Sequence, residues 1–140
     1  MTNEAWAGYR NGRIPVELLT FVGMGVMSGQ PQYLHPTVAA AWRALQGDFK
    51  REGANLLITE GYRTLELQQA YWDRWWAGNG NTAARPGTSN HGWATAIDMA
   101  NYSAVPVATR RRLVQARGFS LAAGERVGES WHIEFVGALA

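Results

Sequence analysis

Two of the three histidines stand close to acidic residues, which is an arrangement that suits a metal ion. His91 is followed by Asp98, and His132 is preceded by Glu129. Two imidazoles and one carboxylate, with a fourth position left open, are a common ligand set for a catalytic zinc ion. A second carboxylate beside the metal, but not bound to it, suits a general base. The combination indicates a catalytic metal site, and because the chain has no cysteine, only histidine and carboxylate can supply its ligands.

Side-chain alternation along two predicted strands explains how these residues could meet. In a strand over 94–99, Asp98 points away from the bulky apolar side chains, and in a strand over 131–136 His132 does the same. If the two strands are neighbours in one sheet, both side chains lie on one face. His91, in the loop just before the first strand, then reaches the same place.

Each residue taken alone has a simpler interpretation. A histidine near an aspartate is most often a hydrogen-bonded structural pair, and Glu129 and Glu134 could be ordinary solvated residues. The third histidine, His35, has no comparable neighbours and is predicted to be structural. The metal site depends on the combination of these residues in one small domain.

The elements that must position these residues follow from periodicity and turn residues. Apolar residues recur every three or four positions after Pro36, which predicts a helix that ends near Gly53. Thr64 suits the cap of a second helix. Further expected elements are an irregular leader over 1–35, a strand over 55–60, a helix over 64–78, a long loop over 78–92 and a helix over 107–117. This order predicts one α+β domain over 1–140, with a small, mostly antiparallel sheet flanked by helices.

Composition and charge exclude several classes of protein. Hydrophobic residues make up 46% of the 140 residues, which excludes a disordered chain. The net charge of only +2, with one basic run at 110–112, argues against a nucleic-acid partner. The apolar stretch over 16–27 is too short for membrane insertion. The N-terminus carries no signal-peptide pattern, so we expect synthesis in the cytoplasm. We also expect a monomeric protein.

Two motifs carry a resemblance to a known family. Ser89, His91 and Asp98 match the pattern Ser-x-His-x(6)-Asp, and Glu129 and His132 match the Glu-x-x-His that follows it. An upstream Tyr-Arg-[Ser/Thr]-x(3)-Gln element matches Tyr62, Arg63, Thr64 and Gln68. With these motifs the chain resembles the zinc D-Ala-D-Ala carboxypeptidase and L-alanyl-D-glutamate endopeptidase family of peptidoglycan peptidases. The resemblance extends from about Gly12 to Phe135, and the stretch PGTSNHGW at 86–93 is most similar to short actinobacterial and phage members.

The resemblance implies a Hedgehog/DD-peptidase-like fold and a role for each matching residue. Zinc would be bound by His91, Asp98 and His132, and Glu129 would be the catalytic base. Arg63 would anchor or polarise the substrate, since a guanidinium recognises a carboxylate better than an ammonium does. Further substrate contacts are expected from Tyr62, Gln68, Ser89, Trp93 and Trp131.

Four other positions carry separate expectations. The family usually has glycine where this chain has Ala94, and the added methyl group is expected to narrow the approach to the strand. The residues themselves favour core and groove wall, and not a sugar platform, for Trp72, Trp75 and Trp76.

The resulting expectation is a zinc-dependent peptidoglycan peptidase of the phage endolysin type. It would hydrolyse an amide in the stem peptide or the cross-link through a zinc-activated water, and would act on the cell wall after release from the host cytoplasm. One alternative is a D-Ala-D-Ala carboxypeptidase or dipeptidase of bacterial wall metabolism. Another, from a different class, is a non-catalytic zinc-containing wall-binding module, although such a module needs neither Glu129 nor Arg63.

Overall fold

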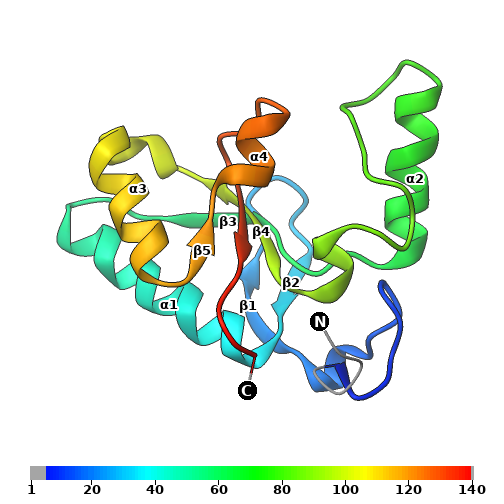
Figure 1. Cartoon of the computed structure of the whole chain (residues 1–140), viewed down its shortest axis with the longest axis horizontal. Coiled ribbons are helices and arrows are strands. Elements are labelled where there is room, and N and C mark those ends of the chain that lie inside the picture. The colour runs from blue at the N-terminus through cyan, green and yellow to red at the C-terminus, as the bar shows by residue number, and fades with distance from the viewer. Residues whose placement is uncertain (1–5, 140) are drawn as a thin grey trace.

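The computed structural model describes residues 6–139 and shows an α+β fold (Figure 1). A two-stranded sheet and a four-stranded sheet are both antiparallel, as the sequence predicted. No helix in the described range is long and apolar enough to cross a membrane. In chain order the elements are β1 (Thr20–Met24), β2 (Pro31–Leu34), α1 (Pro36–Arg51), β3 (Leu57–Glu60), α2 (Leu65–Trp76), β4 (Ala96–Ala100), α3 (Val107–Ala116), β5 (Phe119–Ser120), α4 (Ala122–Arg126) and β6 (His132–Phe135).

The four-stranded sheet has the order β3-β4-β6-β5, so β4 and β6 are neighbours, as the convergence of the histidines requires. Asp98 on β4 is paired with His132 on β6 and with Glu60 on β3. These three polar residues therefore lie side by side across the sheet. Ile97, which precedes Asp98, and Ile133, which follows His132, point to the opposite face of the sheet and are fully buried.

Helix α1 forms the other half of the hydrophobic core. His35 caps it, because its Nδ1 accepts a hydrogen bond from the backbone N–H of Thr37 at 3.2 Å. This gives the third histidine the structural role that the sequence predicted. The predicted apolar stripe is completely buried against the sheet and consists of Val38, Trp42, Leu45 and Phe49.

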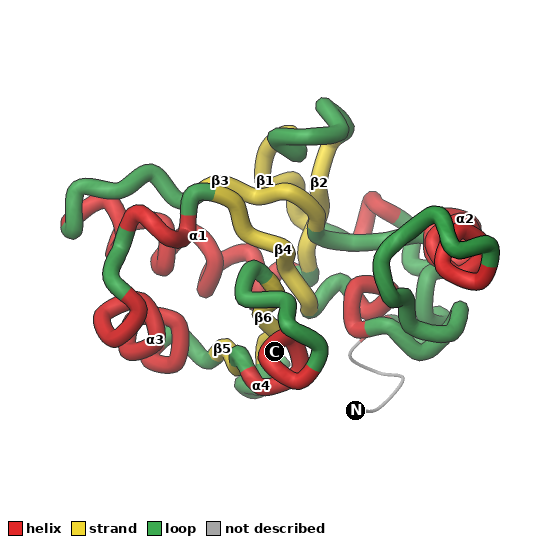
Figure 2. The backbone as a smooth tube through the Cα atoms, turned by 90° about the horizontal axis from the view of Figure 1, so that it is seen from above, coloured by secondary structure: helices red, strands yellow, loops and turns green. Residues whose placement is uncertain are grey.

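Helix α2 lies at the end of the molecule opposite α3 in both views (Figures 1 and 2). Thr64 caps it as predicted, with its hydroxyl accepting from the N–H of Leu67. The prediction that its three tryptophans form core and groove wall is wrong, because they belong neither to the core cluster nor to the lining of the cavity described below. Their rings pack on one another at 5.4–5.7 Å, outside the core cluster, and the Trp76 side chain is 70% exposed. The helix extends away from the sheet, so it offers these residues no core to join.

Three further predictions about the backbone need correction. The supposed irregular leader contains the β1–β2 hairpin, whose short strands are interrupted by a bulge after Phe21 that hides their alternation. The strand predicted over 94–99 begins only at Ala96, because a 3-10 helix, η3 (Asn90–Trp93), comes first and Ala94 ends it in the left-handed conformation at φ 59°. Short elements β5 and α4 were not predicted at all.

Candidate metal centre and cleft

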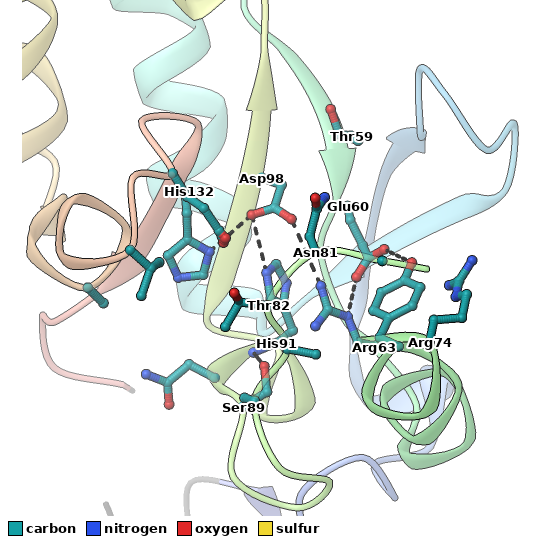
Figure 3. Close-up of a pocket in the computed structure, with 18 of the residues that line it drawn as sticks. Thr59, Glu60, Arg63, Arg74, Asn81, Thr82, Ser89, His91, Asp98 and His132 are labelled. Carbon is teal, nitrogen blue, oxygen red and sulfur yellow. Dashed lines mark hydrogen bonds and ion pairs between the residues drawn. The ribbon is translucent and has the colours of Figure 1, made fainter. Parts of the chain in front are cut away.

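A cavity of about 720 Å³ opens above the polar face of the sheet (Figure 3). Its lining includes Ala123 and Val127, from the region of α4, and the loop over 79–84. This volume lies within the range of about 300–1,000 Å³ that is usual for ligand sites. Six of the residues singled out in the sequence line it, namely Arg63, Ser89, His91, Asp98, Glu129 and His132.

The three predicted metal ligands meet in this cavity. His91 Nε2 lies 3.3 Å from Asp98 Oδ1, and His132 Nδ1 lies 3.0 Å from the same oxygen. One ligand atom from each residue lies within 4.8 Å of the others. The side of the cluster that faces the cavity leaves room for a water or a substrate oxygen. The donor set and this open side therefore fit a catalytic zinc ion.

Hydrogen bonds fix the orientation of His91. Its Nδ1 lies 2.8 Å from the carbonyl oxygen of Gly61, which can only accept, so Nδ1 is the donor and Nε2 is the nitrogen that faces Asp98 and a metal. The Ser89 hydroxyl accepts from the His91 backbone N–H at 3.1 Å and so caps η3. A side chain at Gly92 would lie 1.9 Å from Asn11 Oδ1, so only glycine lets the N-terminal segment support this loop.

Glu134, which was not predicted to belong to the site, orients His132. Its Oε2 lies 2.8 Å from His132 Nε2, while its Oε1 accepts from the Asn90 side chain at 2.9 Å. The carboxylate thus connects β6 to the residue that precedes His91. In the sequence, Glu134 could have been assigned to the site because it lies two residues after His132 and so shares its strand face. A solvent-exposed strand residue, however, has the same spacing.

The pKa values of two residues in the cluster, Asp98 and His132, differ strongly from their ordinary values. Burial alone would raise the pKa of Asp98, but the two neighbouring histidines outweigh it and hold that pKa well below its usual range. Burial alone would lower the pKa of His132, but the hydrogen bonds to Asp98 and Glu134 raise it to about 9. In the metal-free protein His132 is therefore protonated at neutral pH, and zinc must displace a proton to bind there.

Glu129 lines the same cavity as the three ligands but is not one of the group. Its backbone N–H donates to the Gly124 carbonyl at 2.8 Å, and its own carbonyl accepts from the His132 N–H. Within residues 6–139 its carboxylate forms no hydrogen bond or ion pair. Burial and the charge of Asp98 raise its pKa, which makes the carboxylate a better proton acceptor when ionised.

Arg63 reaches the cluster from the turn before α2. Its Nη2 lies 3.9 Å from Asp98 Oδ2, while Nη1 donates to Gln68 Oε1 at 2.7 Å and Nε is hydrogen-bonded to Glu60. Glu60 also accepts from the Tyr71 hydroxyl at 2.7 Å, and the guanidinium carbon lies 4.6 Å from the centroid of the Tyr71 ring. Glu60 and Tyr71 were not singled out in the sequence, although the i,i+3 spacing of Glu60 and Arg63 was a signal.

Four expected substrate contacts are not on the wall of the cavity. Gln68 is 2% exposed, and its amide is bonded to Arg63 and to the Ala84 carbonyl at 2.6 Å. The Tyr62 hydroxyl accepts from the Ile14 N–H at 3.0 Å. Trp93 packs on Trp6 at 4.6 Å. The lining residues also do not include Trp131.

Ala94 has a different consequence from the one expected. It is fully buried and does not line the cavity, so its methyl group does not narrow the approach to the strand. Alanine at this position instead has a conformational cost, because its backbone is left-handed and that conformation favours glycine over alanine.

Comparisons with known proteins identify the family of the chain. The chain matches the family model described as VanY, D-alanyl-D-alanine carboxypeptidase, over residues 31–138. It is 36% identical over 72 residues to the peptidoglycan L-alanyl-D-glutamate endopeptidase CwlK of Bacillus subtilis (strain 168), a match that covers 50% of this chain and 43% of that protein.

Solved structures show the same fold. The vancomycin-resistance D,D-dipeptidase VanXYg, in complex with a D-Ala-D-Ala phosphinate analogue, is 22% identical with a TM-score of 0.66, over 85% of this chain and 55% of that one. The D,D-pentapeptidase VanY of the VanB-type resistance cassette, solved as a variant in complex with Zn(II), is 22% identical with a TM-score of 0.57, over 88% of this chain and 82% of that one. The chain thus spans about half the length of CwlK and of VanXYg.

Proposed function

Because the chain belongs to the VanY D-alanyl-D-alanine carboxypeptidase family, we propose that it is a zinc-dependent peptidase that hydrolyses an amide of peptidoglycan. The observation that carries the proposal is the meeting of His91, Asp98 and His132 in a cavity that also contains Glu129 and Arg63. A non-catalytic wall-binding module would need neither of the last two residues.

Each residue has a distinct task in this reaction. His91, Asp98 and His132 would hold the zinc, which when bound lowers the pKa of water and polarises the scissile carbonyl. Glu129 takes the proton from the attacking water and delivers it to the leaving amine. Arg63, fixed by Glu60 and Gln68, offers its remaining donors to a substrate carboxylate close to the scissile bond.

Two candidate bonds follow from the relatives. Similarity to CwlK favours an endopeptidase that cleaves within the stem peptide, and the cavity has room for several peptide residues. The description of the matching family favours a D-Ala-D-Ala carboxypeptidase instead. A phage endolysin that acts on the wall after release from the cell would be an enzyme of the first kind. This finer assignment is supported by the similarity of the stretch at 86–93 to phage members.

Digestion of purified peptidoglycan tests the proposal and separates the two bonds. Mass spectrometry of the products identifies the new termini. An endopeptidase releases stem-peptide fragments whose new N-terminal amine belongs to a residue from inside the stem peptide. A carboxypeptidase releases free terminal D-alanine. If peptidoglycans of several chemotypes yield neither product with the zinc-loaded protein, the proposed function is wrong.

A further inference from the structure

The cavity continues beyond Arg63 to a second arginine. Arg74, in the last turn of α2, lines it together with Asn79 and Gly80. Figure 3 shows Arg74 beyond Arg63, on the side away from Asp98 and His132. The hydrolysis itself does not require a cation at this distance from the metal ligands.

The backbone and stem of Arg74 are held by the loop that follows α2, and its guanidinium lies against Tyr71. Its carbonyl accepts from the Asn79 N–H at 2.8 Å. A side chain at Gly80 would lie 3.2 Å from the Arg74 Cβ, so the loop packs closely on the stem of this arginine. Its guanidinium carbon lies 4.8 Å from the centroid of the Tyr71 ring. A guanidinium held by an aromatic ring still has N–H groups available to a ligand.

The two arginines of the cavity differ in their partners. Arg63 is bonded to Glu60 and Gln68. Arg74 is exposed and forms no ion pair with a carboxylate anywhere in the described part of the chain. A cation that lies against an aromatic ring and has no acidic partner, on the wall of a substrate cavity, is suited to an anionic group of the substrate.

We propose that Arg74 binds a second carboxylate of the substrate, so that the preferred substrate is a peptide with two carboxylates, one near the scissile bond at Arg63 and one farther along at Arg74. This inference rests on the proposed function and narrows its substrate class. Both guanidinium carbons lie against the Tyr71 ring, so they are no farther apart than the sum of 4.6 and 4.8 Å. Extended peptide advances about 3.3–3.6 Å per residue, so the two guanidinium carbons are separated by no more than about three residues of extended chain, and one short peptide could reach both.

The test uses two synthetic stem peptides that differ only in the second carboxylate, which is free in one and a primary amide in the other. Hydrolysis of both is measured for the wild type, Arg74→Gln and Arg112→Gln. Arg112, which is exposed on α3 and outside the cavity lining, is the matched control because its substitution removes the same charge. Binding of both peptides to a Glu129→Gln protein, with and without Arg74→Gln, is measured by calorimetry.

The wild type and Arg112→Gln should prefer the free carboxylate by about three- to tenfold, a moderate effect because solvent screens a partly exposed ion pair. Arg74→Gln should lose this preference in both hydrolysis and binding. Hydrolysis with equal preference in the wild type and Arg74→Gln would overturn the inference and leave the proposed function intact. Binding that depends on Arg74 without any hydrolysis would support the inference and overturn the proposed function. Absence of both hydrolysis and binding would overturn both.

Discussion

Asp98 and His132 are register partners on adjacent antiparallel strands, and the imidazole Nδ1 lies 3.0 Å from the carboxylate Oδ1. The other nitrogen of the same ring lies 2.8 Å from Glu134. His132 is therefore held between two carboxylates. Of these two carboxylates, only Asp98 belongs to the group that could hold a metal ion, so we infer that the task of Glu134 is to fix the ring.

Replacement of Glu134 should weaken zinc binding. In Glu134→Gln the charged acceptor of the His132 Nε2–H is lost, so the ring becomes a poorer and less well-oriented ligand. Loss of such a partner typically lowers metal affinity by about 10- to 100-fold. Competition with a chromophoric chelator measures the dissociation constant. Glu125→Gln, which alters an exposed glutamate paired with Arg111, is the control and should bind zinc like the wild type. Wild-type affinity in both Glu134→Gln and Glu134→Ala would show that Glu134 does not support the metal.

Replacement of Glu129 should separate metal binding from turnover. Glu129→Gln keeps the size of the side chain but cannot take a proton, so we expect a loss of turnover of about 100- to 10,000-fold. Zinc content and thermal stability should stay close to those of the wild type, because Glu129 lies outside the ligand group. A variant that loses its zinc would instead identify Glu129 as a ligand.

Arg63→Lys tests recognition of the carboxylate near the scissile bond. An ammonium cannot reproduce the planar two-point contact of a guanidinium, so kcat/KM should fall by roughly ten- to a hundredfold while zinc content is unchanged. A substrate with this carboxylate amidated provides the comparison. The wild type should lose activity on it, and Arg63→Ala should barely distinguish the two forms. Equal discrimination by the wild type and Arg63→Ala would assign Arg63 a structural role.

A fourth prediction concerns stability and does not depend on the metal. Asp48 on α1 accepts hydrogen bonds from Arg117 Nε and Nη2 at 2.7 and 2.8 Å. Hydrogen bonds to Arg117, opposed by burial, lower the pKa of Asp48 in the folded protein below 3.8. The stabilisation is therefore fully present above that value and is lost as the pH falls through the lowered pKa.

Asp48→Asn should thus reduce the free energy of unfolding at pH 7 by at most about 1 kcal/mol, the upper end for ion pairs that solvent screens, since Arg117 is partly solvated. The difference from the wild type should disappear in acid. Urea unfolding of both proteins at pH 7 and below pH 3.8 measures it. Asp73→Asn, on an exposed part of α2, is the control. A difference that does not change with pH would mean that the pair does not stabilise the fold through its charge.

The meeting of Asp98 and His132 could be predicted because it follows from strand alternation, whereas His91 comes from the segment before the strand. Once 94–99 and 131–136 were recognised as strands, Asp98 and His132 had to share a face if the strands were neighbours, and the order β3-β4-β6-β5 makes them neighbours. The cap at Thr64 could be predicted for a different reason, since it depends only on local sequence.

The remaining features depend on tertiary contacts that no local pattern shows. The tryptophans of α2 have the spacing of a buried stripe, but nothing in the sequence shows that the helix projects from the sheet. The left-handed conformation of Ala94 contradicts the usual preference of alanine. Gln68, predicted to contact substrate, is bonded to Arg63 and Ala84, partners that only the folded chain brings together.

The most direct test of the account is a zinc titration of the chelator-treated protein, with release of new peptidoglycan termini as the readout. The metal-free protein should be inactive. Activity should rise in proportion to added zinc and stop rising at one ion per chain, and His132→Ala should gain little activity over the same range. Full activity of the metal-free protein, or full activation of His132→Ala, would contradict a zinc site formed by His91, Asp98 and His132.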